Sequence, residues 1–174
     1  MDYAMDFIRN STCTVFVWLE SQTRLLEIME RNQKKTDAFW SINGSRCTSE
    51  AGVYREFGEK LFFPSYFGKN WGALVDCMLD RVVYSADKNN HYFVINDAFL
   101  IGKLDTNLRC AFFSTLCELE RNWNCGTEWK RGQFRFILCV REYQVFDFTQ
   151  MLSDMNIPYA MFRDINGDLT IQEY

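Results

Sequence analysis

The stretch Phe63–Asp80, FPSYFGKNWGALVDCMLD, places large rings around a proline, a glycine and the start of a helix. It holds one of only two prolines in the chain, and Tyr66, Phe67 and Trp71 stand close together in it. Loops that only connect two elements are usually polar. A loop this rich in rings predicts a surface that is exposed for contact with another molecule. A helix is expected to begin after it, near Asn70.

The residues after this loop separate onto two sides of a helix when each one advances by 100°. One side is apolar, predicts a contact with the core, and holds Trp71, Leu74, Val75 and Met78. The other side is small and acidic, and holds Gly72, Ala73, Asp76 and Asp80. The helix is therefore expected to pack on one side and to offer carboxylates on the other.

Gly72 is unexpected within a helix, where glycine costs about 1 kcal/mol relative to alanine. A crowded helix crossing that leaves no room for a β-carbon explains it without any function. Close approach of a partner at the start of the helix is the functional alternative. Both readings stay open at the level of sequence.

Three apolar runs predict strands, and they alternate with helical patterns along the chain. The runs are Ala38–Asn43, Tyr92–Asn96 and Phe134–Val140. Ser49 is placed to cap the helix after the first strand, and Asp105 is placed to cap a long helix after the second. This alternation predicts βαβ units and a small parallel sheet with right-handed crossovers.

Both ends of the chain carry further elements. Cys13–Leu19 reads as a strand and Ser21–Asn32 as a helix with one apolar stripe. The tail predicts a helix over Asp147–Met155, and then a hairpin around Asn166-Gly167. No linker or internal repeat interrupts the chain, so residues 1–174 are expected to form one domain.

The loop and helix resemble the signature of the barstar family. The residues that carry the resemblance are Pro64, Tyr66, Gly68, Asn70, Ala73, Leu74, Asp76 and Cys77, with Phe67 and Trp71 as common variants. It covers about residues 36–141 and implies an α/β fold with a three-stranded parallel sheet flanked by helices. Residues 1–35 and 142–174 then become additions to that core.

The resemblance also implies a function, because barstar-family proteins are intracellular inhibitors of secreted ribonucleases such as barnase. It implies that Tyr66 is a ring contact, that Gly68 gives the turn and that Asn70 fixes the loop or caps the helix. Asp76 would stand where a substrate phosphate lies. The expected contact set is Tyr66, Phe67, Gly68, Lys69, Asn70, Gly72, Val75, Asp76 and Asp80.

Two positions depart from the family pattern. Gly72 stands where the family often has aspartate, and Val75 stands where barstar itself has tryptophan. One carboxylate and one large ring are therefore missing from the family's contact face. The ribonuclease that this chain inhibits is therefore expected to differ from barnase in detail.

The charge of the chain favours a protein partner over nucleic acid. The net charge is −4 and the isoelectric point is about 5.1, with no run of Lys or Arg. Nucleic-acid binders usually carry a basic stripe. The expected partner is a cognate toxin, a basic ribonuclease.

The sequence also predicts where the protein is located. No apolar run is long enough to span a membrane, and MDYAMDFIRN lacks the basic start of a signal peptide, so a cytoplasmic protein is expected.

The sequence does not predict an enzyme. His91 is the single histidine, and its place before a strand suggests a surface residue. No nucleotide-binding or hydrolase motif occurs, and no cofactor or metal is expected. The seven cysteines lack the spacing of metal ligands, and Cys77, Cys110, Cys117 and Cys139 fall in apolar runs that favour structural thiols.

The alternative to ribonuclease inhibition is a non-inhibitory protein-interaction or regulatory module that uses the same aromatic loop.

Overall fold

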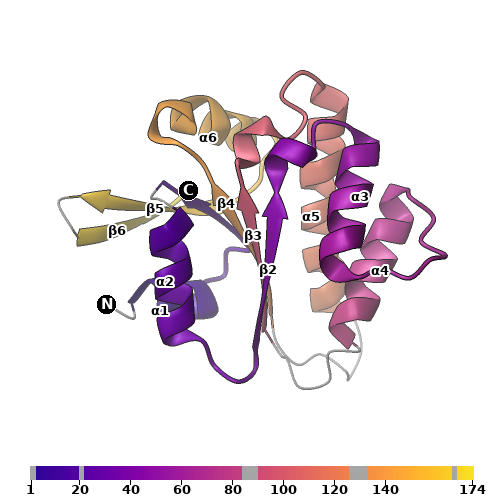
Figure 1. Cartoon of the computed structure of the whole chain (residues 1–174). Helices are drawn as coiled ribbons and strands as arrows, with labels where there is room; N and C mark the ends of the chain where they lie inside the picture. The colour runs from indigo at the N-terminus through magenta and orange to yellow at the C-terminus, as the bar shows by residue number, and fades with distance from the viewer. Residues whose placement is uncertain (1–2, 20–21, 84–89, 126–132, 166–167) are drawn as a thin grey trace.

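The computed structural model describes residues 3–19, 22–83, 90–125, 133–165 and 168–174. Helices and strands alternate along most of this length (Figure 1). The helices are α1 (Tyr3–Asn10), α2 (Gln22–Asn32), α3 (Glu50–Leu61), α4 (Trp71–Val83), α5 (Thr106–Cys125) and α6 (Val145–Asp154). The strands are β1 (Val15–Trp18), β2 (Asp37–Asn43), β3 (Asn90–Asn96), β4 (Gln133–Cys139), β5 (Tyr159–Ile165) and β6 (Asp168–Glu173). Short 3-10 turns are η1 (Gly44–Arg46), η2 (Ala98–Leu100) and η3 (Glu142–Gln144).

The sheet has six strands in the order β2-β3-β4-β1-β5-β6, so the expectation of a three-stranded sheet was wrong. The three predicted core strands lie side by side as β2, β3 and β4, and they are parallel. Strand β1 pairs with β4 on one side and β5 on the other, again in parallel. Strand β6 lies at the edge of the sheet and is antiparallel to β5. The two ends of the chain therefore supply half of the strands.

Strand β1 takes an interior place because its residues are apolar on both faces. All four residues of Val15–Trp18 are buried. A continuous apolar run of this kind suits a parallel strand that is covered from both sides. Val15 and Val17 join the core on one side of the sheet, and Phe16 and Trp18 join the core on the other.

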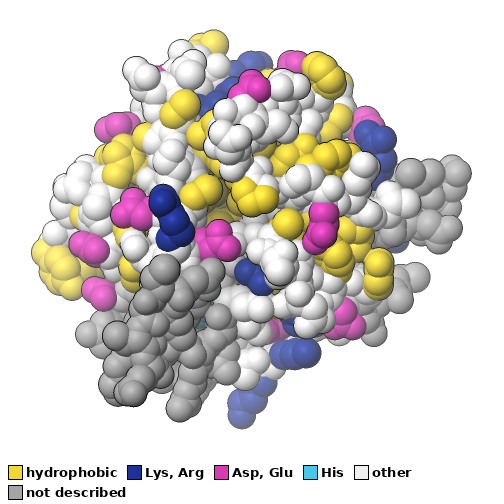
Figure 2. Space-filling model, turned by 180° about the vertical axis from the view of Figure 1, so that it is seen from behind, with side chains coloured by type: hydrophobic (Ala, Val, Ile, Leu, Met, Phe, Trp, Pro, Cys, Tyr) yellow, Lys and Arg dark blue, Asp and Glu magenta, His cyan; other side chains and the backbone are white. Residues whose placement is uncertain are grey.

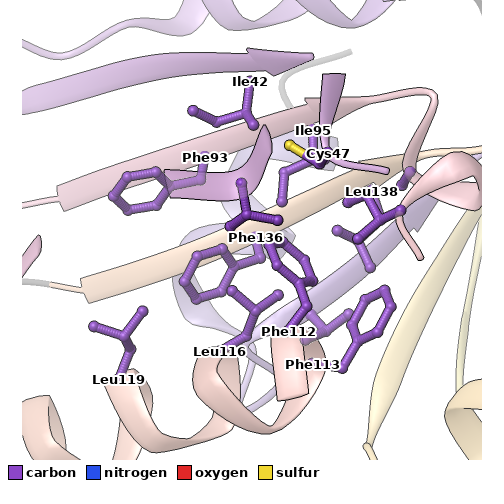
Figure 3. Close-up of a cluster of buried hydrophobic side chains, with 14 of the residues drawn as sticks. Ile42, Cys47, Phe93, Ile95, Phe112, Phe113, Leu116, Leu119, Phe136 and Leu138 are labelled. Atoms are coloured by element: carbon purple, nitrogen blue, oxygen red, sulfur yellow. The ribbon is translucent and has the colours of Figure 1, made fainter. Parts of the chain in front are cut away.

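Helices cover both faces of the sheet, as Figure 1 shows. Helices α3, α4, α5 and α6 share one apolar core with the sheet, and α1 and α2 share the second. In Figure 3, Phe112 and Phe113 of α5 lie in the same buried cluster as Phe93 and Phe136 of the sheet. The helix carrying the predicted site is anchored in this larger core.

The predicted helix caps are confirmed. The Ser49 hydroxyl accepts a hydrogen bond from the Gly52 amide at 3.2 Å, at the start of α3. Asp105 accepts from the Leu108 amide at 3.0 Å, at the start of α5. Each cap satisfies an amide that the first turn of a helix leaves without an intrahelical partner.

Helix α1 was not predicted, and two arginines connect it to strands β2 and β4. Arg9 of α1 donates to Asp37 of β2 at 2.7 Å. Arg135 of β4 donates to the carbonyl oxygens of Ile8 and Ser11, at 3.0 and 2.9 Å. The N-terminal segment is therefore bonded to the strands of the family core as well as packed on them.

His91 is buried rather than at the surface, so that expectation is corrected. The Trp40 indole donates to His91 Nδ1 at 3.4 Å, and the His91 ring lies 6.0 Å from the ring of Phe134. His91 lies in β3, which has strands on both sides and helices over both faces. The order of strands, which the local sequence does not reveal, encloses it.

The six cysteines whose side chains the structure describes are free thiols in different environments. Burial raises the pKa of Cys47 and of Cys139 to about 12, so both stay protonated and unreactive at neutral pH. Cys110 was expected among structural thiols, but it is exposed on α5.

We expect a thiol-alkylating reagent at pH 8 to modify Cys110 well before Cys47 and Cys139. Mass spectrometry of peptides after short exposures checks this order. The two buried thiols should react at the same speed as Cys110 only after the protein is unfolded in denaturant. Rapid labelling of Cys47 in the native protein would contradict the buried placement.

Candidate functional site

The predicted site lies between α3 and α4, at the loop of residues 62–70. Helix α3 ends at Phe62, which adopts a left-handed conformation with φ 54°. The Gly58 carbonyl accepts hydrogen bonds from the amides of Phe62 and Phe63. A further bond runs from the Phe67 amide to the Pro64 carbonyl at 3.0 Å. The loop is therefore a hydrogen-bonded structure rather than a loose connection.

Most of the rings in this loop pack against α3. The Tyr54 ring of α3 lies 5.3 Å from Trp71 and 6.1 Å from Phe67, both edge-on. Phe63 and Phe67 are also in edge contact, at 5.0 Å. The Trp71 indole donates to Glu50 at 3.1 Å. These rings support the loop from beneath.

Tyr66 is the ring that the loop presents to solvent. Its side chain is 80% exposed, whereas Phe67 and Trp71 are half-buried. The presented aromatic cluster inferred from sequence therefore reduces to Tyr66, with Phe62 exposed at the near end of the loop. The contacts of Phe67 with Tyr54 and Phe63 make it mainly a support for Tyr66.

Asn70 fixes the junction between loop and helix, as expected. Its side-chain oxygen accepts from the Ala73 amide at 2.9 Å, and its amide nitrogen donates to the Gly68 carbonyl at 3.3 Å. The left-handed residue of this turn is Lys69, with φ 48°, which directly follows Gly68. A non-glycine residue there is strained by about 1 kcal/mol, and the Asn70 bonds on either side hold it in place.

Helix α4 has the two sides that the 100° rule predicts. Leu74, Val75 and Met78 are buried in the core. Gly72, Asp76 and Asp80 are exposed on the other side.

Val75 must be removed from the expected contact set. It is only 4% exposed because it is buried in the core on the side of α4 that packs against α5 and α3, so it is not available to a partner. The position belongs to the packing of α4 rather than to its outer surface.

Asp76 and Asp80 are exposed carboxylates on the outer side of α4. Neither forms an ion pair with any residue in the part of the chain that the structure describes. The rigid loop before them and the buried side of α4 hold their backbone in place. Two solvated carboxylates on a fixed helix can attract cations without first breaking an internal bond.

Among the described residues, no group of three or more His, Cys, Asp or Glu side chains is placed to hold a metal ion. None of the described helices is long and apolar enough to cross a membrane. Figure 2 shows the face opposite to that of Figure 1, where the Lys and Arg side chains are scattered rather than gathered in a band.

Some residues of the site could not be found from the sequence. Glu50 and Tyr54 hold Trp71 and Phe67 in place, but both belong to α3 and precede the loop by a full helix. The apolar spacing of Tyr54 predicts a packed residue and gives no sign of its partner. Glu50 has the pattern of an ordinary acidic residue in the first turn of a helix, and nothing nearby in the sequence indicates its bond to Trp71.

The fold and this loop–helix surface define an α/β protein with an acidic helix side and a projecting ring that are both exposed to solvent. Residues 38–144, from β2 to η3, match the family model for barstar, described as the barnase inhibitor. The match covers more than half of the chain, and the chain belongs to the barstar family. Members of this family are inhibitors of ribonucleases, not enzymes. No curated protein matches the chain.

Proposed function

We propose that this chain is an intracellular immunity protein that binds and inhibits a bacterial ribonuclease toxin through residues 66–80. The observation that carries the proposal is Asp76, an exposed carboxylate that forms no ion pair with any described residue, on a helix whose other side is buried in the core. Family membership gives the class of partner, and the site supplies a group of the right charge for it.

The chemistry of ribonucleases explains why an acidic plug would work. An enzyme that cleaves RNA must gather cationic groups around the phosphate it attacks. A carboxylate on the inhibitor can occupy the place of that phosphate and pair with the same cations. Long-range attraction between an acidic inhibitor and a basic cleft also speeds their encounter. A cytoplasmic location follows as part of the proposal, because immunity is needed where RNA is cleaved.

The fixed loop adds to affinity by limiting what must be ordered on binding. The Asn70 bonds to Gly68 and Ala73 hold the turn, and the rings beneath it hold Tyr66 outward. Each rotamer-rich side chain that becomes immobile at an interface costs about 0.5–1.5 kcal/mol. A preformed loop avoids much of that cost.

The test is inhibition of RNA cleavage by two enzymes, barnase and the product of the reading frame next to this chain's gene. We expect stoichiometric inhibition of at least one of them by the purified chain. Binding without inhibition would favour the alternative of a protein-interaction module. If the chain neither binds nor inhibits either enzyme, the proposal is excluded.

Replacing Tyr66 with alanine should weaken binding to the inhibited enzyme by about 2 kcal/mol, roughly 30-fold. An exposed ring at the centre of an interface loses its whole packed surface on truncation. Tyr143→Ala is a matched control, because Tyr143 is 76% exposed and lies in η3, outside the proposed contact. Isothermal titration gives both affinities. Equal loss in the two variants would show that Tyr66 has no special role.

A further inference from the structure

The glycines that the structure describes differ in the space around them. A β-carbon on Gly44 would lie 2.5 Å from the Asn96 carbonyl oxygen, and one on Gly52 would lie 2.2 Å from that of Arg46. Gly102 has φ +54° and would meet backbone at 2.8 Å. These three glycines are required by the fold, because backbone cannot move aside cheaply.

Gly58 and Gly72 are not required in this way. The nearest atoms to a β-carbon would be a Phe67 ring carbon at 3.8 Å for Gly58, and Asn70 Oδ1 at 3.5 Å for Gly72. Both distances are ordinary van der Waals contacts. Both glycines lie within helices, where alanine is the better residue. The crowded-crossing explanation of Gly72 is therefore excluded by the structure.

The two unforced glycines lie on either side of the same loop. Gly58 is in α3 and Gly72 is in the first turn of α4. Gly68, within the loop, is an intermediate case, because its β-carbon would press on Asn70 Nδ2 at 3.2 Å. Helix-weakening residues without a packing reason thus gather around residues 62–70, where the chain presents Tyr66.

A groove of about 770 Å³ runs between α3 and this loop, and Gly58 lines it. Its apolar walls are Ala51, Tyr54, Phe63, Pro64 and Phe67. Its charged groups are Glu50, Arg55, Glu59 and Lys69, two of each sign. The groove therefore offers rings and no net charge, in contrast to the acidic outer side of α4.

We propose that the surface in contact with the inhibited ribonuclease extends from α4 across the loop onto α3. An apolar side chain of that enzyme enters the groove beside Gly58, and its main chain passes over Gly72. The rings that line the groove favour an apolar occupant, and the missing β-carbons provide the room. The groove adjoins the loop that carries Tyr66, so one partner reaches both. This inference rests on the proposed function and extends its contact area.

The first test uses the chain alone. Gly58→Ala and Gly72→Ala should each keep or raise the melting temperature, by up to about 4 °C. Gly52→Ala is the matched control within α3, and it should lower the melting temperature by more than about 4 °C because its β-carbon meets backbone. Destabilisation by Gly58→Ala comparable to that of Gly52→Ala would overturn the inference.

The second test uses the ribonuclease that the wild-type chain inhibits, barnase or the neighbouring gene product, in catalytically inactive form. Gly58→Leu fills the groove and Gly72→Leu covers the first turn of α4, and leucine is a good helix former at both places. Each should weaken binding at least tenfold while circular dichroism stays unchanged. Wild-type affinity in both variants, together with a loss in Asp76→Ala, would refute the extended surface and leave the proposed function standing. If the wild-type chain binds neither enzyme, both fail.

Discussion

Replacing Asp76 with alanine should weaken binding of the inhibited ribonuclease by roughly 2–5 kcal/mol, a factor between about 30 and about 4,000. Asp76 has no internal counter-ion in the described part of the chain, so its removal leaves the free protein almost unchanged. In the complex, the cations that it neutralises would remain buried without a partner. Their stranded charge accounts for most of the expected loss.

The measurement is the affinity for the catalytically inactive enzyme at several salt concentrations. Asp147→Ala is the matched control, because Asp147 is an exposed aspartate in the first turn of another helix. The control should bind like wild type, and the affinity of the wild type should fall as salt rises. If Asp76→Ala and Tyr66→Ala both bind like wild type, the enzyme meets another surface, and the family resemblance extends to the fold alone.

Replacing Arg9 with alanine should lower the free energy of unfolding by about 3–5 kcal/mol, a large share of the usual total for a domain. Asp37 has no exposed surface, and its oxygens accept from Arg9 at 2.7 Å, from Asn90 at 2.9 Å and from the Lys34 amide at 3.0 Å. Without Arg9, a buried carboxylate keeps its charge and loses its cation. Arg9 also bonds to the Asn32 carbonyl, so α1 and α2 would both lose an anchor.

Urea denaturation at pH 7 measures the loss in stability. Arg31→Ala is the control, because Arg31 forms a solvent-exposed pair with Glu27 at 4.0 Å. Exposed pairs of this kind contribute about 0–1 kcal/mol. A loss of the same small size in Arg9→Ala would show that the Arg9–Asp37 pair does not hold the N-terminal segment in place.

The same pair predicts how stability depends on pH. Burial alone would raise the pKa of Asp37, but the bonds from Asn90, Lys34 and Arg9 outweigh burial and lower that pKa below its ordinary value. A carboxyl group with a lowered pKa in the folded state stabilises the fold above its unfolded pKa. That contribution is lost as the pH falls through the folded pKa. Stability should therefore decline on the acid side of the ordinary aspartate pKa, and less steeply in Asp37→Asn.

The sequence by itself determined the elements whose signals are local. The strands that became β2, β3 and β4 are short apolar runs, and the caps Ser49, Asn70 and Asp105 lie next to the helices they begin. The two sides of α4 follow from helical spacing alone. The hairpin strands of the tail were also predicted, although their turn, Asn166-Gly167, lies outside the described residues. Each of these features depends on residues a few positions apart.

The tertiary structure alone decided which of these surfaces is free. It placed β1 between β4 and β5, buried His91, turned Phe67 and Trp71 toward α3, and left Tyr66 outside. It also showed that Gly72 has room for a β-carbon. These outcomes depend on partners far apart in the chain, such as Arg135 and Ile8, separated by 127 positions. Local periodicity states that a residue prefers to be buried or exposed, but the neighbour that covers it is chosen only when distant segments pack together.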